Sequence, residues 1–243
     1  MKTLVLVHGF MGGSAQWDAQ AAHFGDRYNV FAPDLPGFGA NRHLPVLHSI
    51  SAFADWVIGE LRRNGIKRYH LLGHSMGGMI VQEMTRKDQD NIDRLVLYGT
   101  GAIGVLPGRF ETIEQSKARA LADGARVTAR RIAATWFLDH QQDPAFESCA
   151  AIAENASRDA IQAGLDAMQA WRGDDFLPSI TPETLVLWGD GDRTYQWQQA
   201  HQLWETIPRS NLAVVPNCAH AVHLEMPEVF NLLVSGFLAR EGE

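Results

Sequence analysis

The stretch from Leu71 to Met79 constrains the fold of this 243-residue chain more than any other. It contains Gly73-His74-Ser75-Met76-Gly77, a G-x-S-x-G motif, between an apolar run, Tyr69 to Leu72, and a helical pattern, Met76 to Arg86. A serine on a sharp turn between a strand and a helix has a strained backbone, and the turn lifts its hydroxyl above the sheet edge. Glycines flank such a serine because side chains there would collide with the turn. This setting predicts that Ser75 is a nucleophile, although elsewhere the same letters can match by chance.

The charge and the cysteine content exclude several classes of function. The net charge of −7 argues against nucleic acid or an anionic membrane as the main partner. The 2 cysteines, Cys149 and Cys218, are too few and too far apart for a disulfide framework or a metal cluster, so we expect no metal site. The first apolar run, Leu4 to Val7, is too short for a signal peptide or a membrane span. We therefore expect a cytoplasmic protein without a membrane partner, and the sequence leaves its oligomeric state open.

Apolar runs alternate with helical patterns over most of the chain. Six of these runs are expected to be strands: Thr3–Val7, Tyr28–Ala32, Tyr69–Leu72, Arg94–Tyr98, Thr184–Trp188 and Asn211–Val215. Between the first two, Ser14 is expected to cap a helix from about Ala15 to Phe24. Continuous apolar strands separated by helices predict an α/β fold with a doubly wound, mostly parallel sheet. Ligands bind beyond the carboxyl ends of the strands in such sheets, which is where Ser75 is expected to lie.

This alternation is interrupted between Leu106 and Asp175, where no strand pattern is present. Four helical patterns fill the interval: Thr112–Leu121, Ala125–Phe137, Ala145–Ala153 and Arg158–Trp171. Helices without a strand between them, inside a series of alternating strands and helices, predict an inserted unit. We expect a helical cap over residues 106–175, inserted in a core that comprises residues 1–105 and 176–243.

The chain also offers partners for a nucleophilic serine. A serine hydroxyl needs a base to remove its proton, and the base needs an orienting carboxylate. The fifth expected strand is followed by Gly189-Asp190-Gly191-Asp192-Arg193, and the sixth by Pro216-Asn217-Cys218-Ala219-His220. Asp192 and Asp190 are both candidate acids, and His220 and His223 are both candidate bases. Cys218 is expected to be a small buried residue, because no separate cysteine–histidine arrangement is evident.

Several motifs together resemble the α/β-hydrolase superfamily. They are His8-Gly9-Phe10, Asp34-x-Pro-Gly-Phe-Gly39, Gly73-His-Ser-Met-Gly-Gly78, Gly189-x-x-Asp192 and Ala219-His220-x-x-His223-x-Glu225-x-Pro227, in that order. The resemblance implies a Ser75, Asp192 and His220 triad, with Asp190 a turn residue and His223 a structural hydrogen-bond partner. It covers nearly the whole chain outside the cap. The two antiparallel strands that usually precede the first motif are not evident, so one sheet edge is expected to be trimmed at the N-terminal side.

The resemblance also assigns groups around the serine. The N–H groups of Phe10 and Met76 would form the oxyanion hole, with Met76 following the nucleophile and Phe10 in the loop after the first strand. His8 and His74 are expected to brace the loops instead of acting as bases. The candidate pocket wall comprises Met11, Phe110, Trp136 and Trp171, with Phe137 and Met168 as further candidates. The cap residues among these can equally be the core of the cap, which is the commoner role for large apolar side chains.

Within the superfamily, the chain looks most like 3-oxoadipate enol-lactonases and small carboxylesterases. The expected function is hydrolysis of a small carboxylic ester or lactone through an acyl-enzyme, without a cofactor. One alternative is hydrolysis of C–C bonds in ring-cleavage products, although those enzymes usually carry Asn and Trp where this chain has His74 and Ala221. A lyase with the same triad is a second alternative, and a hydrolase-like small-molecule receptor is a non-enzyme alternative. Fold alone does not determine the substrate.

Overall fold

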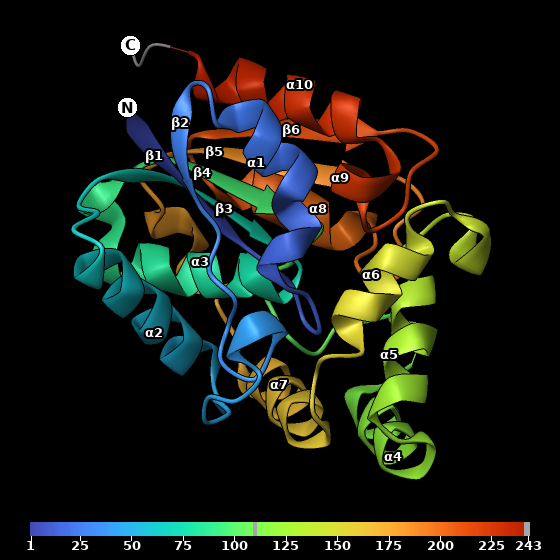
Figure 1. The fold of residues 1–243 in the computed structure, drawn as a ribbon. Coiled ribbons are helices and arrows are strands. Elements are labelled where there is room, and N and C mark those ends of the chain that lie inside the picture. The colour runs from blue at the N-terminus through green and yellow to red at the C-terminus, as the bar shows by residue number, and fades with distance from the viewer. Residues whose placement is uncertain (109–110, 241–243) are drawn as a thin grey trace.

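The computed structural model describes residues 1–108 and 111–240 (Figure 1). Its strands are β1 (Lys2–Val7), β2 (Tyr28–Phe31), β3 (Tyr69–His74), β4 (Ile92–Tyr98), β5 (Glu183–Gly189) and β6 (Ser210–Val215). They match the predicted strands to within two residues at each end. The agreement follows from burial, because parallel strands covered on both faces are continuously apolar in sequence.

The six strands form one parallel sheet in the order β2-β1-β3-β4-β5-β6. The chain runs outward from β1 to β2 and then returns past β1 to β3, so the strand order reverses between β1 and β3. In open α/β sheets, the crevice beyond the carboxyl ends of the strands at this reversal is the usual ligand site. Phe10 follows β1 and Ser75 follows β3, so both lie at this crevice. The predicted doubly wound parallel sheet is confirmed.

The α-helices are α1 (Asp18–Phe24), α2 (Ile50–Arg63), α3 (Met76–Asp88), α4 (Ile113–Asp123), α5 (Ala125–Ala134), α6 (Phe146–Ala153), α7 (Arg158–Ala170), α8 (Trp197–Thr206), α9 (Val222–Glu225) and α10 (Pro227–Leu238). Helices α1 and α10 cover one face of the sheet, and α2 and α3 cover the other (Figure 1). Helices on both faces remove the sheet from water, which is the main source of stability for this architecture.

Local sequence explains where α2 begins, but not where the helical segment after β1 begins. Helix α2 begins after Ser49, whose hydroxyl accepts a hydrogen bond from the N–H of Ala52 at 3.1 Å. The expectation that Ser14 caps the first helix is wrong. Ser14 instead opens a short 3-10 helix, and its own N–H donates to Oδ1 of Asp34 at 2.7 Å. A carboxylate from a distant loop therefore satisfies this helix start, which a local sequence pattern cannot reveal.

Helices α4 to α7 lie between β4 and β5 in the chain, and Figure 1 shows them on the lower right side of the molecule, outside the sheet and its covering helices. The four predicted helices in this interval are therefore present. An isolated antiparallel bridge between Ile103 and Arg172 closes the base of this insertion. The division into a core of residues 1–105 and 176–243 and a cap of residues 106–175 stays a prediction.

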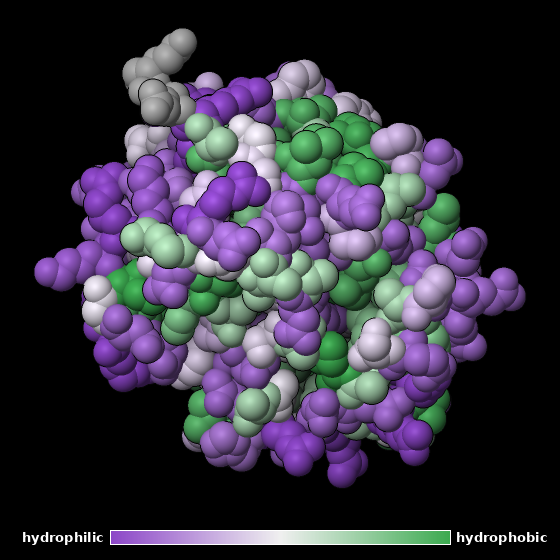
Figure 2. All heavy atoms as spheres, turned by 45° about the horizontal axis from the view of Figure 1, so that its top comes forward, coloured by the Kyte–Doolittle hydropathy of each residue, from purple (hydrophilic) through white to green (hydrophobic). Residues whose placement is uncertain are grey.

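Most of the face shown in Figure 2 is hydrophilic, with a group of apolar residues on the side of α10. Val229 and Leu232 are the exposed large apolar side chains of that helix. Within the described ranges, no helix combines the length and the hydrophobicity that crossing a bilayer requires.

Candidate active site

Ser75 lies in a strained turn between β3 and α3. Its φ of 58° and ψ of −120° are in a region that side chains rarely adopt. A Cβ on Gly73 would lie 2.3 Å from the carbonyl oxygen of Gly77, and one on Gly77 would lie 2.3 Å from that of Val7. Both positions therefore require glycine, as the motif implied. The Ser75 N–H donates to the Tyr98 carbonyl at 3.0 Å, which ties the turn to the neighbouring strand.

Asp192 and His220 form a buried pair. Oδ2 of Asp192 lies 2.7 Å from Nδ1 of His220, and the exposed fractions of the two side chains are 0% and 1%. Oδ1 of Asp192 accepts hydrogen bonds from the N–H groups of Thr194 at 2.7 Å and Tyr195 at 3.0 Å. Because the carboxylate can only accept, it places a proton on Nδ1 of His220 and leaves Nε2 free to act as a base.

The structure thus brings Asp192, and not Asp190, to His220. Asp190 is exposed. The hydrogen bonds that a turn aspartate accepts from loop N–H groups are made by Asp192, from Thr194 and Tyr195. The reason is the tight turn: Gly189 and Gly191 pass so close to the loop before His220 that Cβ atoms there would lie 2.2 Å and 3.2 Å from its carbonyl oxygens. The chain can therefore turn far enough to deliver the second aspartate inward.

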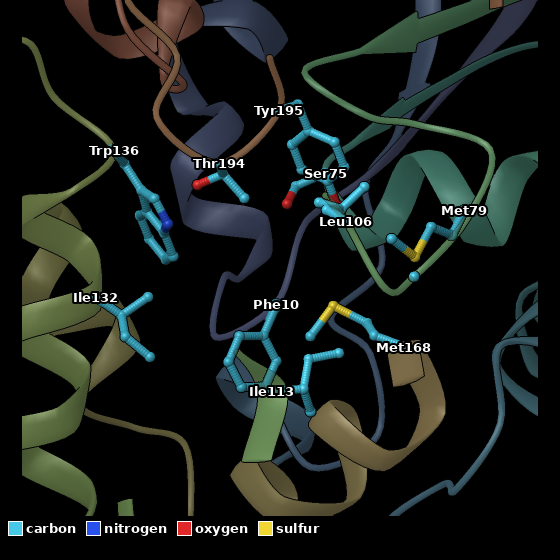
Figure 3. A pocket seen from close by; sticks show the side chains of 11 residues that line it. Phe10, Ser75, Met79, Leu106, Ile113, Ile132, Trp136, Met168, Thr194 and Tyr195 are labelled. Carbon is cyan, nitrogen blue, oxygen red and sulfur yellow. The ribbon is translucent and has the colours of Figure 1, made fainter. Parts of the chain in front are cut away.

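The Ser75 hydroxyl points into a cavity beside this pair (Figure 3). It makes no hydrogen bond to His220 in the part of the chain that the structure describes. Hydrogen bonds between catalytic groups are often long in structures without a ligand and shorten when substrate binds. The serine turn is nevertheless close to the base, because the ring centroid of His74, the residue before Ser75, lies 4.5 Å from that of His220.

Two buried side chains hold the backbone of His220, and a third, His223, contacts one of them. Nε2 of His74 and the hydroxyl of Tyr98 each donate to the His220 carbonyl at 3.0 Å. The Tyr98 hydroxyl also lies 3.0 Å from Nδ1 of His223. Burial lowers the pKa of His74 well below its usual value and lowers the pKa of His223 to about 3. Both are neutral at physiological pH, and His223 contributes a structural hydrogen bond, as we predicted.

Met76 and the loop that carries Phe10 both lie next to the serine. Met76 is the first residue of α3, where an N–H has no acceptor within the helix. The loop that carries Phe10 also approaches closely, since a Cβ on Gly9 would lie 2.9 Å from Cβ of Ser75. His8 braces this loop: its Nδ1 lies 2.8 Å from the Gly9 carbonyl, and its Nε2 accepts the Leu35 N–H at 3.0 Å. Burial lowers the pKa of His8, so it stays neutral.

The walls of the cavity are mostly apolar. Its lining comprises Phe10, Ser75, Met79, Gly104, Leu106, Ile113, Ile132, Trp136, Met168, Thr194 and Tyr195. Figure 3 shows Trp136 and Ile132 across the cavity from Met79 and Met168, with the serine hydroxyl at one end. The Tyr195 ring stacks on His220, with ring centroids 5.6 Å apart. Trp136 and Met168 were predicted wall residues, whereas most of the others were missed.

Several predicted wall residues lie elsewhere. Met11 is fully buried in the core. Trp171 does not line the serine cavity; its Nε1 donates to Glu83 at 3.4 Å in a separate surface depression. Phe137 packs in the core against Phe146, with ring centroids 6.4 Å apart. Phe110 lies outside the described residues. Sequence identified these side chains as large and apolar, but the orientation of each helix and loop decides whether such a residue meets the cavity.

No cluster of three or more histidine, cysteine, aspartate or glutamate side chains in the described ranges could hold a metal ion. Cys218 is buried, and its thiol donates to Oε2 of Glu225 at 3.2 Å. Burial raises the pKa of this thiol. It therefore stays protonated, which fits its expected role as a small buried residue.

Fold and site together define a class of protein. The chain has a parallel sheet with a strained serine after β3, an aspartate after β5 and a histidine after β6. The sequence pattern of the α/β hydrolase fold matches residues 2–227, so this chain belongs to the α/β hydrolase family. The predicted family is confirmed.

Similar proteins cover nearly the same length. RutD of Agrobacterium fabrum, named for carbamate hydrolysis, is 26% identical over 97% of this chain and 92% of its own. A Pseudomonas protein named 2-hydroxy-6-oxononadienedioate/2-hydroxy-6-oxononatrienedioate hydrolase is 25% identical over 98% of this chain and 88% of its own.

Solved structures give the same result for the fold. A thermophilic esterase from Thermogutta terrifontis has a TM-score of 0.88 and 26% identity, over 98% of this chain and 89% of that one. The enol-lactonase of Burkholderia xenovorans LB400 also has a TM-score of 0.88, over 99% and 93% of the two chains, but its 21% identity shows similarity of fold alone. The chain is thus a member of a hydrolase family with relatives of several activities.

Proposed function

We propose that the protein is a serine hydrolase that cleaves a small carboxylic ester or lactone through an acyl-enzyme. The observation that carries this proposal is the buried pair of Asp192 and His220, 2.7 Å apart, beside a serine on a strained turn. A buried aspartate that fixes the proton on Nδ1 of a histidine prepares Nε2 to accept a proton from a serine. The esterase from Thermogutta terrifontis, at 26% identity, supports the same choice of reaction.

The proposed reaction has two halves. Oγ of Ser75 attacks the carbonyl carbon of the ester while Nε2 of His220 takes the hydroxyl proton. The N–H groups of Phe10 and Met76 stabilise the negative charge on the carbonyl oxygen of the tetrahedral intermediate. When the intermediate collapses, the bond to the alcohol breaks and His220 returns the proton to that alcohol. Water then attacks the acyl-enzyme with the same base, which releases the carboxylic acid and regenerates Ser75.

The cavity favours a substrate with an apolar group next to the carbonyl. Apolar side chains from the core and from the inserted helices surround the serine hydroxyl, among them Met79, Ile132 and Trp136. Burial of an apolar acyl group there would contribute about 0.8 kcal/mol for each methylene removed from water. A lactone would react in the same way, with its alcohol remaining attached to the acyl group after the ring opens.

Hydrolysis of C–C bonds is the second candidate function, because of the similarity to the Pseudomonas relative. A vinylogous diketone, the substrate type of such enzymes, is therefore assayed beside p-nitrophenyl esters and an enol-lactone. Turnover of the diketone above that of both ester and lactone would favour the second candidate. Turnover of none of them would favour the receptor.

Replacement of the serine tests the proposal. We expect Ser75→Ala to lower kcat on p-nitrophenyl butyrate by at least about 10,000-fold, because the attacking atom is removed. Ser148→Ala is the matched control: Ser148 is exposed on α6 and its hydroxyl donates only to the Ala145 carbonyl. Near-normal turnover by Ser75→Ala would reject Ser75 as the nucleophile.

A further inference from the structure

Three residues between α5 and α6, Trp136, Phe137 and Leu138, are here named the wall segment. The Trp136 side chain forms part of the cavity wall, and its ring centroid is 6.4 Å from that of His220. Phe137 anchors the segment in the core. The backbone of the wall segment contacts both loops that carry the acid and the base, although it is more than 50 residues from either in the chain.

Arg193 joins the wall segment to the loop of Asp192. Its Nη1 donates to the Phe137 carbonyl at 2.9 Å, and its Nη2 donates to the Leu138 carbonyl at 3.0 Å. A guanidinium is planar and presents fixed pairs of N–H groups, so two bonds to consecutive carbonyls orient the segment as well as hold it. Because Arg193 directly follows Asp192, this contact fixes the segment relative to the acid.

Glu225 and a backbone bond join the wall segment to the loop of His220. Oε1 of Glu225 accepts the Leu138 N–H at 2.6 Å, while its Oε2 accepts the Ala219 N–H at 2.8 Å. On the other side of His220, the Ala221 N–H donates to the Trp136 carbonyl at 2.9 Å. Both neighbours of His220 in the chain are therefore tied, directly or through one carboxylate, to the wall segment.

Close packing completes this junction. A Cβ on Gly191 would lie 2.9 Å from Cδ1 of Leu138 and 3.2 Å from the Cys218 carbonyl oxygen. The acid loop therefore lies directly against both the wall segment and the base loop, and the three cannot slide past one another without losing these contacts.

We propose that Arg193 and Glu225 are positioning residues that lock the wall segment to the loops of Asp192 and His220. The lock keeps Trp136 at a fixed spacing from His220, so a bound acyl group is held where the base and Ser75 can act on it. The inference rests on the proposed function, and it adds that Arg193 acts on the reaction through Trp136. A displacement of about 1 Å in a substrate-positioning wall can cost about 100-fold in rate.

Arg193→Met removes both hydrogen bonds but keeps an apolar stem of similar length. We expect kcat/KM for p-nitrophenyl butyrate to fall by about 10- to 100-fold, measured per active site after titration with an organophosphonate. Arg126→Met is the matched control, since Arg126 is an exposed arginine of α5 whose ion pair with Glu154 lies at the surface. It should leave kcat/KM within about twofold. Equal activity of Arg193→Met and wild type would overturn the proposal.

A double-mutant cycle with Trp136→Ala separates positioning from general support of the fold. If Arg193 acts through Trp136, Arg193→Met should cost less than about threefold once the indole is gone, because interacting residues are not additive. The same loss in both backgrounds would overturn the proposal. Where Arg193→Met does not fold, Arg193→Lys takes its place in the cycle, since one ammonium cannot match both carbonyls. If the organophosphonate labels Ser75 of the wild type but the effects of Arg193→Met and Trp136→Ala are additive, the proposed function stands and only the positioning role of Arg193 is rejected.

Discussion

Asp192→Asn is the substitution that most sharply tests the proposed acid. Asparagine has the same shape as aspartate, so its oxygen can still accept the N–H groups of Thr194 and Tyr195, which now lie 2.7 Å and 3.0 Å from Oδ1. Its amide NH2 then faces Nδ1 of His220, where the carboxylate oxygen lies at 2.7 Å. Because an NH2 group donates, Nδ1 must become the acceptor and the ring proton moves to Nε2. That tautomer cannot take a proton from Ser75.

The expected loss in kcat is about 10,000-fold, or about 5 kcal/mol in the activation barrier, the size of effect seen when a triad acid is made neutral. The effect on stability is smaller. The N–H bonds of Thr194 and Tyr195 lose a charged acceptor, which costs about 1 kcal/mol each. The variant should therefore unfold at a lower denaturant concentration but remain folded under assay conditions.

The assay is kcat on p-nitrophenyl butyrate, with urea unfolding followed in parallel. Asp190→Asn is the control, because Asp190 is exposed and two residues away, and it should change kcat by less than about twofold. The reasoning would be refuted by an Asp192→Asn variant that keeps more than about a tenth of the wild-type kcat. Losses of equal size in both variants would refute it too.

Two further predictions concern stability. Burial lowers the pKa of His70 to about 4. As the pH falls, the unfolded chain therefore binds a proton at His70 at a higher pH than the folded chain does. The stability that is fully present above about pH 6.5 is lost as the pH falls towards 4. The unfolding free energy of the wild type should fall by about 2 kcal/mol more than that of His70→Gln when the pH is lowered from 7 to 4.5. The same fall in wild type and variant would contradict this prediction. Gly77→Ala should destabilise by at least about 2 kcal/mol, since its Cβ would lie 2.3 Å from the Val7 carbonyl oxygen and 2.6 Å from that of His8. Gly236→Ala in α10 is the control, because it has open space around it and should be neutral or stabilising in urea unfolding.

The fold was predictable because its signals are local. The four inner strands β1, β3, β4 and β5 are buried on both faces and are therefore largely apolar runs, and the turn at Ser75 requires glycine at Gly73 and Gly77 for steric reasons. The order of strand, loop and helix then places Ser75, Asp192 and His220 at one edge of the sheet. The sequence offered both Asp190 and Asp192 as the acid. The turn through Gly189 and Gly191 determines which of the two side chains reaches His220.

The cavity wall was much less predictable. Trp136 and Trp171 are both large, apolar and in the insertion, yet one faces the serine and the other contacts Glu83. Such differences depend on how helices pack, and no periodic pattern within one helix contains that information. For the same reason the carbonyls that Arg193 contacts could not be foreseen, since they lie 55 and 56 residues away in the chain.

Covalent labelling of the intact protein tests the central claim most directly. The claim is that Ser75 is the activated nucleophile. After treatment with an organophosphonate, mass spectrometry should show a single added phosphonyl group, and peptide mapping should place it on Ser75. Ser75→Ala should remain unlabelled under the same conditions, and Asp192→Asn should label far more slowly than wild type. A wild-type protein that hydrolyses p-nitrophenyl butyrate while the label is absent, or attached to any other residue, would contradict the account.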